Sequence, residues 1–264
     1  MQTYKLLPTV LYVMLSAPAV FASPFDVTFK DQEELDAHIM DIDKKIANDP
    51  NRAALYLQRA DAMFLIHDFE TAGENYTKAL QLQADLVEAF FGRGLALARA
   101  GRIKEGITDL DIYITRRPNS SLAYTKRGVR YLWISEYERA KSDLEKAIAL
   151  DATNAEAHDD LGVVYAQRKD YVTAAAHFAT AISLEPSYQK AWHNMAVVGF
   201  ISGNDIAALG YVNKSLQLAP QARSSMLLKS QILSALGRLE EAAEVKDEAD
   251  FLPEGNWSEN VAID

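Results

Sequence analysis

The residues that could carry out chemistry in this chain are few. Its five histidines are scattered and show neither the HExxH spacing nor another compact metal-binding spacing. The run His158-Asp159-Asp160 combines acid–base and metal-ligating side chains. Neighbouring residues of a helix point in different directions, so this run needs partners from elsewhere to form a site. The sequence therefore contains no complete catalytic or metal-ligating set.

Other common reactive motifs are also missing from the sequence. The absence of cysteine excludes a disulfide framework, thiolate catalysis and Cys-ligated metal sites. The glycines in residues 92–94 lack the spacing of a phosphate-binding loop, and no Gly-x-Ser-x-Gly elbow occurs. A net charge of −10 disfavours nucleic-acid binding, which needs clustered Lys and Arg. We predict a protein that is not an enzyme and uses no cofactor.

The first 25 residues contain a single charged side chain, Lys5. Residues 6–15 are apolar and residues 16–22 are mostly small, which is the order of a secretory signal peptide. We expect residues 1–22 to be this signal, cleaved after Ala22, and the mature chain to be periplasmic or secreted, without a stable membrane span. The alternative is an uncleaved anchor, because residues 6–25 carry no charge, although Pro8 and Pro18 interrupt that stretch.

The rest of the chain repeats with a period of 34 residues. Three sets of mostly small residues recur at this spacing. The first is Gly94, Gly128 and Gly162, the second is Ala72, Gly106, Ala140, Ala174, Ala208 and Ala242, and the third is Ala79, Tyr113, Ala147, Ala181, Ser215 and Ala249. Each period predicts a helix hairpin, because in residues 155–188 one set of residues at helical spacing precedes the polar turn 168–170 and a second set follows it. The small residues let the two helix backbones approach closely. One hairpin cannot bury its apolar face alone, so the hairpins must stack.

The residues of the repeat resemble the tetratricopeptide repeat family, whose pattern runs from a large residue through Leu-Gly, Tyr, Ala, Phe and Ala to Pro. The best copy has His158 in place of the usual large residue, followed by Leu161, Gly162, Tyr165, Ala174, Phe178, Ala181 and Pro186. Six copies begin at residues 53, 87, 121, 155, 189 and 223 and cover residues 53–256. The resemblance implies an all-α fold, a right-handed superhelical solenoid of about six hairpins.

The two ends of the repeat region are expected to differ from its interior. In residues 23–52, Ile39, Ile42 and Ile46 form an apolar stripe at helical spacing. We expect a helix there that caps the first repeat. The second helix of the last repeat is rich in acidic residues, as a terminal helix facing water must be. Residues 257–264 are expected to form a flexible tail.

The resemblance also implies that the first helix of each repeat lines a concave groove that holds a protein or peptide. The candidate contact residues at these positions are Leu57, Asp61, Phe64, Phe91, Lys126, Trp133, Asp159, Asp160, His193, Asn194 and Phe200. The four aromatic residues among them would anchor an extended peptide or an apolar helix face. They could instead pack between neighbouring first helices.

The charges at these positions bear on the chemistry of the partner. Glu156, Asp159 and Asp160 would make part of the groove acidic and favour a basic segment, unless they form only a solvated cluster. One subgroup of similar proteins grips chaperone C-terminal carboxylates with a Lys-Asn-Asn-Lys-Arg set. The corresponding positions here hold Leu57, Asp61, Gly92, Leu122 and Lys126. The sequence therefore disfavours that mode of binding.

We predict a non-catalytic adaptor or scaffold that holds a partner protein along the concave face, in the bacterial cell envelope. The alternative is an accessory protein or enzyme with a small-molecule or metal cavity near Asp159, Asp160 and His193. Self-association through exposed repeat faces is a third possibility.

Overall fold

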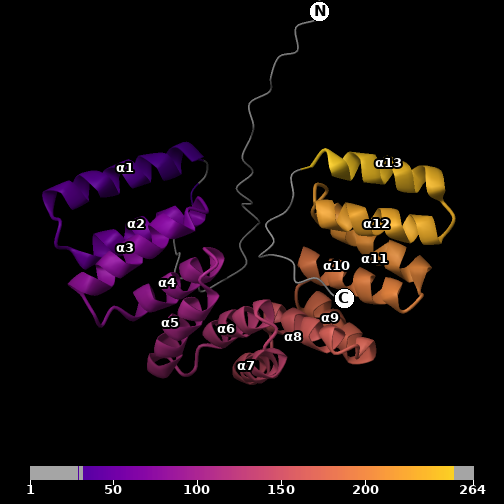
Figure 1. The fold of residues 1–264 in the computed structure, drawn as a ribbon, viewed down its shortest axis with the longest axis horizontal. Helices are drawn as coiled ribbons and strands as arrows, with labels where there is room; N and C mark the ends of the chain where they lie inside the picture. The colour runs from indigo at the N-terminus through magenta and orange to yellow at the C-terminus, as the bar shows by residue number, and fades with distance from the viewer. Residues whose placement is uncertain (1–28, 30–31, 253–264) are drawn as a thin grey trace, which may run out of the picture. The chain divides into compact units, whose positions relative to one another are not determined.

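The computed structural model describes residue 29 and residues 32–252. The expected signal segment at residues 1–22 and the expected tail at residues 257–264 lie outside these residues. Within them the chain forms thirteen helices and no strand (Figure 1), so the predicted all-α fold is confirmed. The helices are α1 (Gln32–Asn48), α2 (Ala53–Leu65), α3 (Phe69–Leu82), α4 (Val87–Arg99), α5 (Ile103–Arg116), α6 (Ser121–Trp133), α7 (Tyr137–Leu150), α8 (Ala155–Gln167), α9 (Tyr171–Leu184), α10 (Gln189–Ile201), α11 (Asp205–Leu218), α12 (Arg223–Ala235) and α13 (Leu239–Asp250).

From α2 onward, first and second helices of the repeat alternate along the chain. The first helices α2, α4, α6, α8, α10 and α12 contain 13 residues each and begin at 34-residue intervals. Helices of one repeat pack on each other, as α8 does on α9 and α10 on α11. A regular sequence period therefore produces a regular succession of hairpins.

One residue of each hairpin turn has a left-handed backbone, and it stands at the same position in all six repeats. These residues are His67 (φ 62°), Gly101 (86°), Ser135 (58°), Lys169 (62°), Gly203 (73°) and Gly237 (77°). Glycine adopts this conformation without a steric clash, whereas a residue with a Cβ atom is strained there. Three of the six turns thus have a residue with a Cβ atom in the left-handed conformation. The packing of the two helices therefore imposes this conformation whether or not the residue is glycine.

The small residues of the repeat lie where two helices approach closely. A Cβ atom on Gly162 would come within 2.6 Å of Phe178 Cε1, and one on Gly128 within 2.9 Å of Leu144 Cγ. Phe178 and Leu144 are both completely buried. The large residue of the second helix therefore occupies the space that the first helix leaves at its glycine.

The chain divides into two compact units, residues 1–97 and 98–264, where the sequence alone predicts one continuous repeat domain. In the first unit, α1 packs on α2, and its Leu35 and Ile42 are buried. An ion pair between Asp43 of α1 and Arg59 of α2, 2.7 Å long, joins the same two helices. The α1 helix thus covers the first helix of the first repeat, as a capping helix would.

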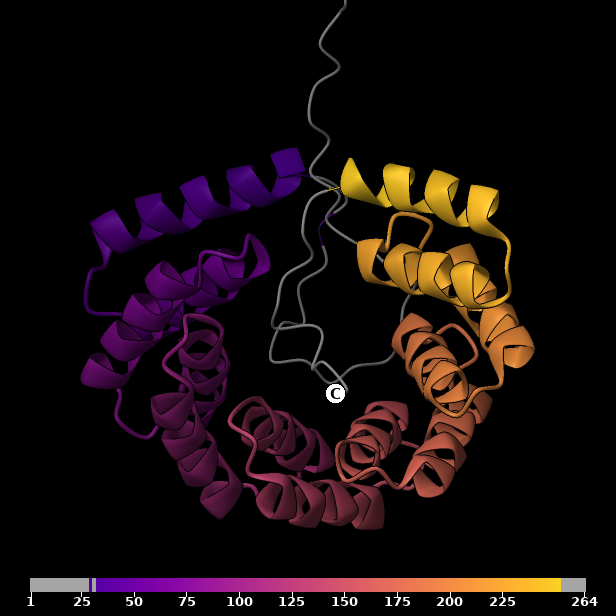
Figure 2. The ribbon, with the colours of Figure 1, turned by 45° about the vertical axis from the view of Figure 1, so that its right-hand side comes forward.

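In the second unit, the first helices α6, α8, α10 and α12 follow one another side by side (Figure 2). The core between first and second helices includes Leu144, Val164 and Phe178. The acidic side chains of α13 are exposed. None of the helices in the described part of the chain is long and apolar enough to span a membrane.

Candidate protein-binding face

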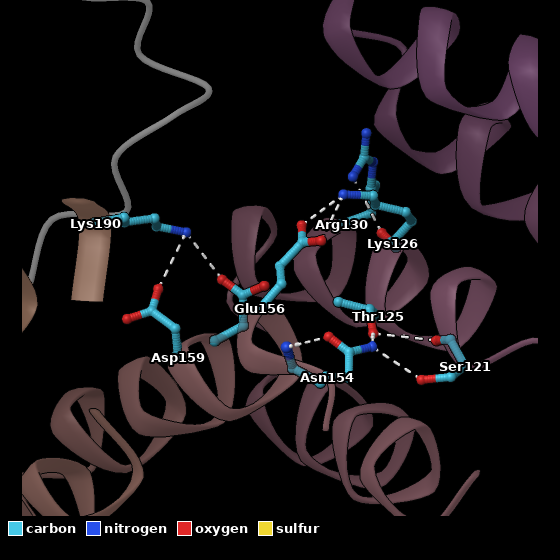
Figure 3. Close-up of polar contacts among 10 residues, drawn as sticks. Ser121, Thr125, Lys126, Arg130, Asn154, Glu156, Asp159 and Lys190 are labelled. Carbon is cyan, nitrogen blue, oxygen red and sulfur yellow. Dashed lines mark hydrogen bonds and ion pairs between the residues drawn. The ribbon is translucent and has the colours of Figure 1, made fainter. Parts of the chain in front are cut away.

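A row of charged side chains crosses three first helices of the second unit. Lys126 Nζ on α6 donates to both carboxylate oxygens of Glu156 on α8, at 2.6 and 2.8 Å (Figure 3). Lys190 Nζ on α10 lies 2.9 Å from Asp160 Oδ1 and 3.6 Å from Asp159 Oδ2, both on α8. The pairs 126–156 and 160–190 occupy equivalent repeat positions with their charges exchanged. We call these five residues the charged row.

The N-terminus of α8 fixes the alignment of this row. The Asn154 side chain accepts a hydrogen bond from Ala157 N at 2.9 Å and so caps the helix. The same side chain donates to Ser121 Oγ at 2.9 Å and to Thr125 Oγ1 at 3.0 Å on α6 (Figure 3). Because this cap bridges two first helices, it holds Glu156 opposite Lys126.

The aspartates of the charged row are buried, which corrects the expectation that they are offered to a basic partner. Asp159 is 0 % exposed and Asp160 is 1 % exposed. Asn194 Nδ2 donates to both carboxylate oxygens of Asp159, at 2.9 and 3.1 Å, and Lys190 engages both aspartates. These side chains therefore join α8 to α10 and are not presented at the surface.

Burial controls the protonation of this cluster. It raises the pKa of Asp159 to about 7, with Asp160 raising it further and Lys190 opposing the rise. Burial likewise raises the pKa of Asp160, whose Oδ2 has no hydrogen-bond partner among the described residues. Although burial disfavours the charged form of Lys190, Asp160 and Asp159 raise its pKa above the ordinary value. The lysine therefore stays charged between the two acids.

His193 does not complete a metal or acid–base site with Asp159 and Asp160. Its Nδ1 lies 2.9 Å from Ser225 Oγ on α12, and burial lowers its pKa to about 4, with Lys190 lowering it further. Lys190 occupies the position where a metal ion would have to meet the two aspartates. Within the described residues, no three His, Asp or Glu side chains are placed to hold a metal ion. The geometry does not fit the metal cavity of the alternative prediction.

Arg130 of α6 is a candidate that the sequence analysis missed. It is 4 % exposed, its Nη1 donates to the Lys126 carbonyl oxygen at 3.2 Å, and its Nε has no hydrogen-bond partner in the part of the chain that the structure describes. The guanidinium lies 4.7 Å from the ring centre of Trp133, and that of Arg99 on α4 lies 5.6 Å from the same ring. Burial lowers the pKa of Arg130 to about 9, and Arg99 adds to this effect. We call these three residues the Arg–Trp cluster.

A sequence signal for Arg130 does exist at its repeat position. The equivalent residues of the other repeats are all apolar, namely Ala62, Ala96, Val164, Val198 and Ile232. A single arginine in an otherwise apolar register is a departure from the packing pattern, and it identifies the position as special.

The four aromatic candidates differ in how far they are exposed. Phe91 is only 2 % exposed, so its expected role as an anchor presented to a partner is corrected: the ring packs inside the protein. Phe64 is half-buried and packs edge-on against Phe69, with ring centres 5.1 Å apart. Phe200 is half-buried against the core of α10, α11 and α12. Trp133, partly exposed beside two guanidinium groups, is the aromatic residue best placed to meet a partner.

The candidates of α2 take part in the internal packing of the first unit. Tyr76 Oη donates a hydrogen bond of 2.6 Å to Asp61 Oδ1, and burial raises the pKa of Asp61 to about 7. Leu57 packs against the same core as Tyr76. A Cβ atom on Gly92 would lie 2.2 Å from Tyr76 Cζ, so this glycine gives the ring its space. Leu57 and Asp61 thus have structural partners already.

The family follows from this repeating architecture together with the sequence. Residues 57–121 and 126–190 match the family model described as Tetratricopeptide repeat. The chain belongs to the tetratricopeptide repeat family. A tetratricopeptide repeat protein from Parabacteroides merdae has the same fold, with a TM-score of 0.72, 18 % identity, and coverage of 84 % of this chain and 88 % of that one.

Two relatives in plants share shorter stretches of sequence with this tetratricopeptide repeat protein. The Protein SGT1 homolog of Oryza sativa subsp. japonica is 32 % identical over 87 residues, which are 33 % of this chain and 24 % of the relative. The Hsp70-Hsp90 organizing protein of Triticum aestivum is 22 % identical over 127 residues, 48 % of this chain and 22 % of the relative. The similarity therefore spans about a quarter of the length of each relative.

Proposed function

We propose that this chain is a non-catalytic adaptor that holds a partner protein or peptide against the first helices of its second unit. Membership of the family supports a protein-interaction role, and one relative is named for organizing two other proteins. The observation that carries the proposal is the partly exposed Trp133 on a first helix, held in place by Arg99 and Arg130. A large aromatic ring with a fixed position is a typical anchor of an interface.

We further propose that the protein works in a bacterial cell envelope. The basis is the order of one basic, then apolar, then small residues in positions 1–22. Sequencing the N-terminus of the protein from an exported fraction tests this proposal. A mature chain beginning at Ser23 is the expected result, and a chain that stays in the cytoplasm with Met1 contradicts it.

A cross-linked pull-down with two matched variants tests the binding face. Trp133→Ala removes the proposed anchor on α6, and Val172→Ala removes an 84 % exposed apolar side chain from the second helix α9. We expect Trp133→Ala to lose a protein that both the wild type and Val172→Ala capture, while all three keep the same helicity.

Other outcomes of this comparison identify where the proposal fails. If Trp133→Ala retains every captured protein, the first helices of the second unit are not the binding face. If only further copies of the chain are captured, and light scattering over a concentration series shows growing mass, the exposed repeat faces serve self-association instead.

A further inference from the structure

We propose that His158 of α8 and His177 of α9 together bind a divalent transition-metal ion, Zn²⁺, through their Nδ1 atoms. This inference goes beyond the proposed adaptor function and does not depend on it. The site differs from the cavity near Asp159, Asp160 and His193, which Lys190 occupies. It also departs from the sequence-based expectation that the chain uses no cofactor.

The first argument is the distance between the two ring nitrogens. His158 Nδ1 lies 3.3 Å from His177 Nδ1, so that without an ion one ring can donate a hydrogen bond to the other. Two zinc–nitrogen bonds of about 2.0–2.1 Å that meet at the tetrahedral angle place their nitrogens roughly 3.3–3.4 Å apart. The two side chains therefore already have the separation of a zinc-ligating pair, and neither helix has to move.

The second argument is that both histidines depart from the repeat pattern at positions that face each other. The residues equivalent to His158 in the other repeats are Tyr56, Phe90, Tyr124, Trp192 and Met226, and those equivalent to His177 are Asn75, Asp109, Asp143, Tyr211 and Val245. In the fifth repeat, Trp192 and Tyr211 fill the two positions with their ring centres 6.2 Å apart. Only the fourth repeat has a histidine at either position, and it has one at both.

The third argument is that the two rings are held in place and remain accessible. The His177 ring stacks on Tyr165 of α8, with 5.5 Å between the ring centres and 8° between the planes. The ring centres of His158 and His177 are 5.6 Å apart. Both histidines are partly exposed, so an ion and its water ligands can reach them from solvent. A ligand pair that is fixed before the ion arrives loses little entropy on binding.

The fourth argument is the protonation state of the rings, because a metal ion binds only neutral imidazole. Burial lowers the pKa of His158, although a backbone hydrogen bond with Ala152 opposes this change. Burial also lowers the pKa of His177, His158 lowers it further, and Glu145 opposes the change. Both rings are therefore neutral at pH 7, and the form protonated at Nε2 offers Nδ1 to the ion.

The donor set indicates which ion the pair would bind. Imidazole nitrogen is a common ligand of Zn²⁺, whereas Mg²⁺ prefers oxygen ligands. Among the described residues, no third His, Asp or Glu is placed to complete the site. Water would therefore fill the remaining positions of the tetrahedron, and the ion would join the first helix of the fourth repeat to its second helix.

Calorimetric titration of the full chain with Zn²⁺ tests the inference, on protein that carries no histidine tag. We expect one ion to bind per chain, and Mg²⁺ at the same concentration not to bind. His158→Phe and His177→Phe each keep an aromatic ring but remove a ligand, and each should weaken Zn²⁺ binding at least about tenfold. His67→Asn removes an exposed histidine of the first unit and keeps a residue that tolerates the left-handed backbone, so binding should not change.

Hydrogen exchange of the wild type keeps the test decisive if the phenylalanine variants do not fold. Zn²⁺ should slow the exchange of α8 and α9 and leave that of α12 and α13 unchanged. The inference is overturned if Zn²⁺ does not bind, if both phenylalanine variants bind it as tightly as the wild type does, or if Mg²⁺ binds equally well. Slower exchange in α12 and α13 without a change in α8 and α9 would place the ion elsewhere and overturn it as well.

Discussion

The first helices of the two units use the same repeat position for opposite chemistry. In the first unit this position is the exposed Gln58 on α2 and Gly92 on α4, where the buried ring of Tyr76 fills the space beside the glycine. In the second unit the position is apolar only on α12, at Leu228, whereas Lys126, Asp160 and Asn194 on α6, α8 and α10 form ion pairs and hydrogen bonds to neighbouring first helices. The backbone period is the same in both units, so the period sets the fold and the side chains at this position set the chemistry of the face.

The difference concerns specificity as well as stability. An aromatic ring packed on glycine stabilises a unit by burying apolar area. Buried ion pairs contribute little net stability, but breaking one is costly because a charge is left without compensation. The 126–156 pair has its lysine on the earlier first helix and the 160–190 pair has it on the later one, so α6 and α8 carry opposite charges at the same repeat position.

The largest expected effect comes from removing the shared cation of the second unit. Lys190→Met leaves Asp159 and Asp160 buried without an ammonium group, and we expect a loss of about 3 kcal/mol in the free energy of unfolding. Lys246→Met breaks an exposed pair with Asp250 and should cost less than about 0.5 kcal/mol. Urea denaturation measures both. A loss below about 1 kcal/mol for Lys190→Met would mean that the two aspartates behave as a solvated surface cluster.

The next effect tests aromatic packing in the first unit. Gly92→Ala places a Cβ atom 2.2 Å from Tyr76 Cζ, and the buried ring has little room to move. We expect a loss of about 2 kcal/mol. In Gly210→Ala the new Cβ meets no atom of the described residues within 4 Å, so the higher helix propensity of alanine should stabilise α11 by up to about 1 kcal/mol. Equal stabilities of the two variants would show that the Gly92–Tyr76 contact is not tight.

Stability measured over a pH series distinguishes the buried Asp61 of the first unit from a carboxylate at the surface. Because the pKa of Asp61 is raised to about 7, the folded state keeps a proton that the unfolded state releases above about pH 4. Stability of α2 and α3 should therefore fall as the pH rises from about 4 to 7. Asp61→Asn keeps an acceptor for Tyr76 and should be more stable than the wild type by on the order of 1–2 kcal/mol at pH 8, and equal to it at pH 4. Hydrogen exchange of α2 and α3 measures this difference, and parallel pH curves would contradict it.

The smallest expected effect comes from substitutions in two hairpin turns of the second unit, at residues 169 and 203. Lys169→Gly removes the Cβ atom that strains a left-handed backbone, and it should stabilise the protein by about 0.5–1 kcal/mol. Gly203→Ala adds a Cβ atom at the equivalent left-handed position and should cost about 1 kcal/mol. Thermal unfolding of the two variants should shift in opposite directions. Shifts of the same sign would show that the two turns are not equivalent.

The 34-residue period of the sequence was sufficient to predict the hairpins, because local patterns of small and apolar residues determine where each helix starts. Which first-helix side chains are exposed to a partner was harder to predict. Phe91 and Trp133 are both aromatic residues of first helices, but Phe91 is buried and Trp133 is partly exposed. Their repeat positions differ, and the exposure of each depends on neighbouring helices that the pattern does not describe.

The burial and pairing of charged side chains were equally hard to predict from the sequence pattern. Asp159 and Asp160 form an acidic run in the sequence, yet Lys190 and Asn194 of the next repeat neutralise and bury them. Testing pairs 30 residues apart would have found Lys126–Glu156 and Asp160–Lys190. Arg130 was detectable only as a polar exception in an apolar register, and the sequence gives no sign that its Nε lacks a hydrogen-bond partner among the described residues.

Site-specific photo-cross-linking tests the central claim, that the first helices of the second unit hold the partner, most directly. A benzophenone side chain at Gln167 probes α8 at the repeat position of Trp133, and one at the exposed Ala179 probes α9 of the same hairpin. With the partner bound, we predict a covalent adduct from position 167 and none from position 179. An adduct from position 179 alone would place the partner on the second helices and contradict the account.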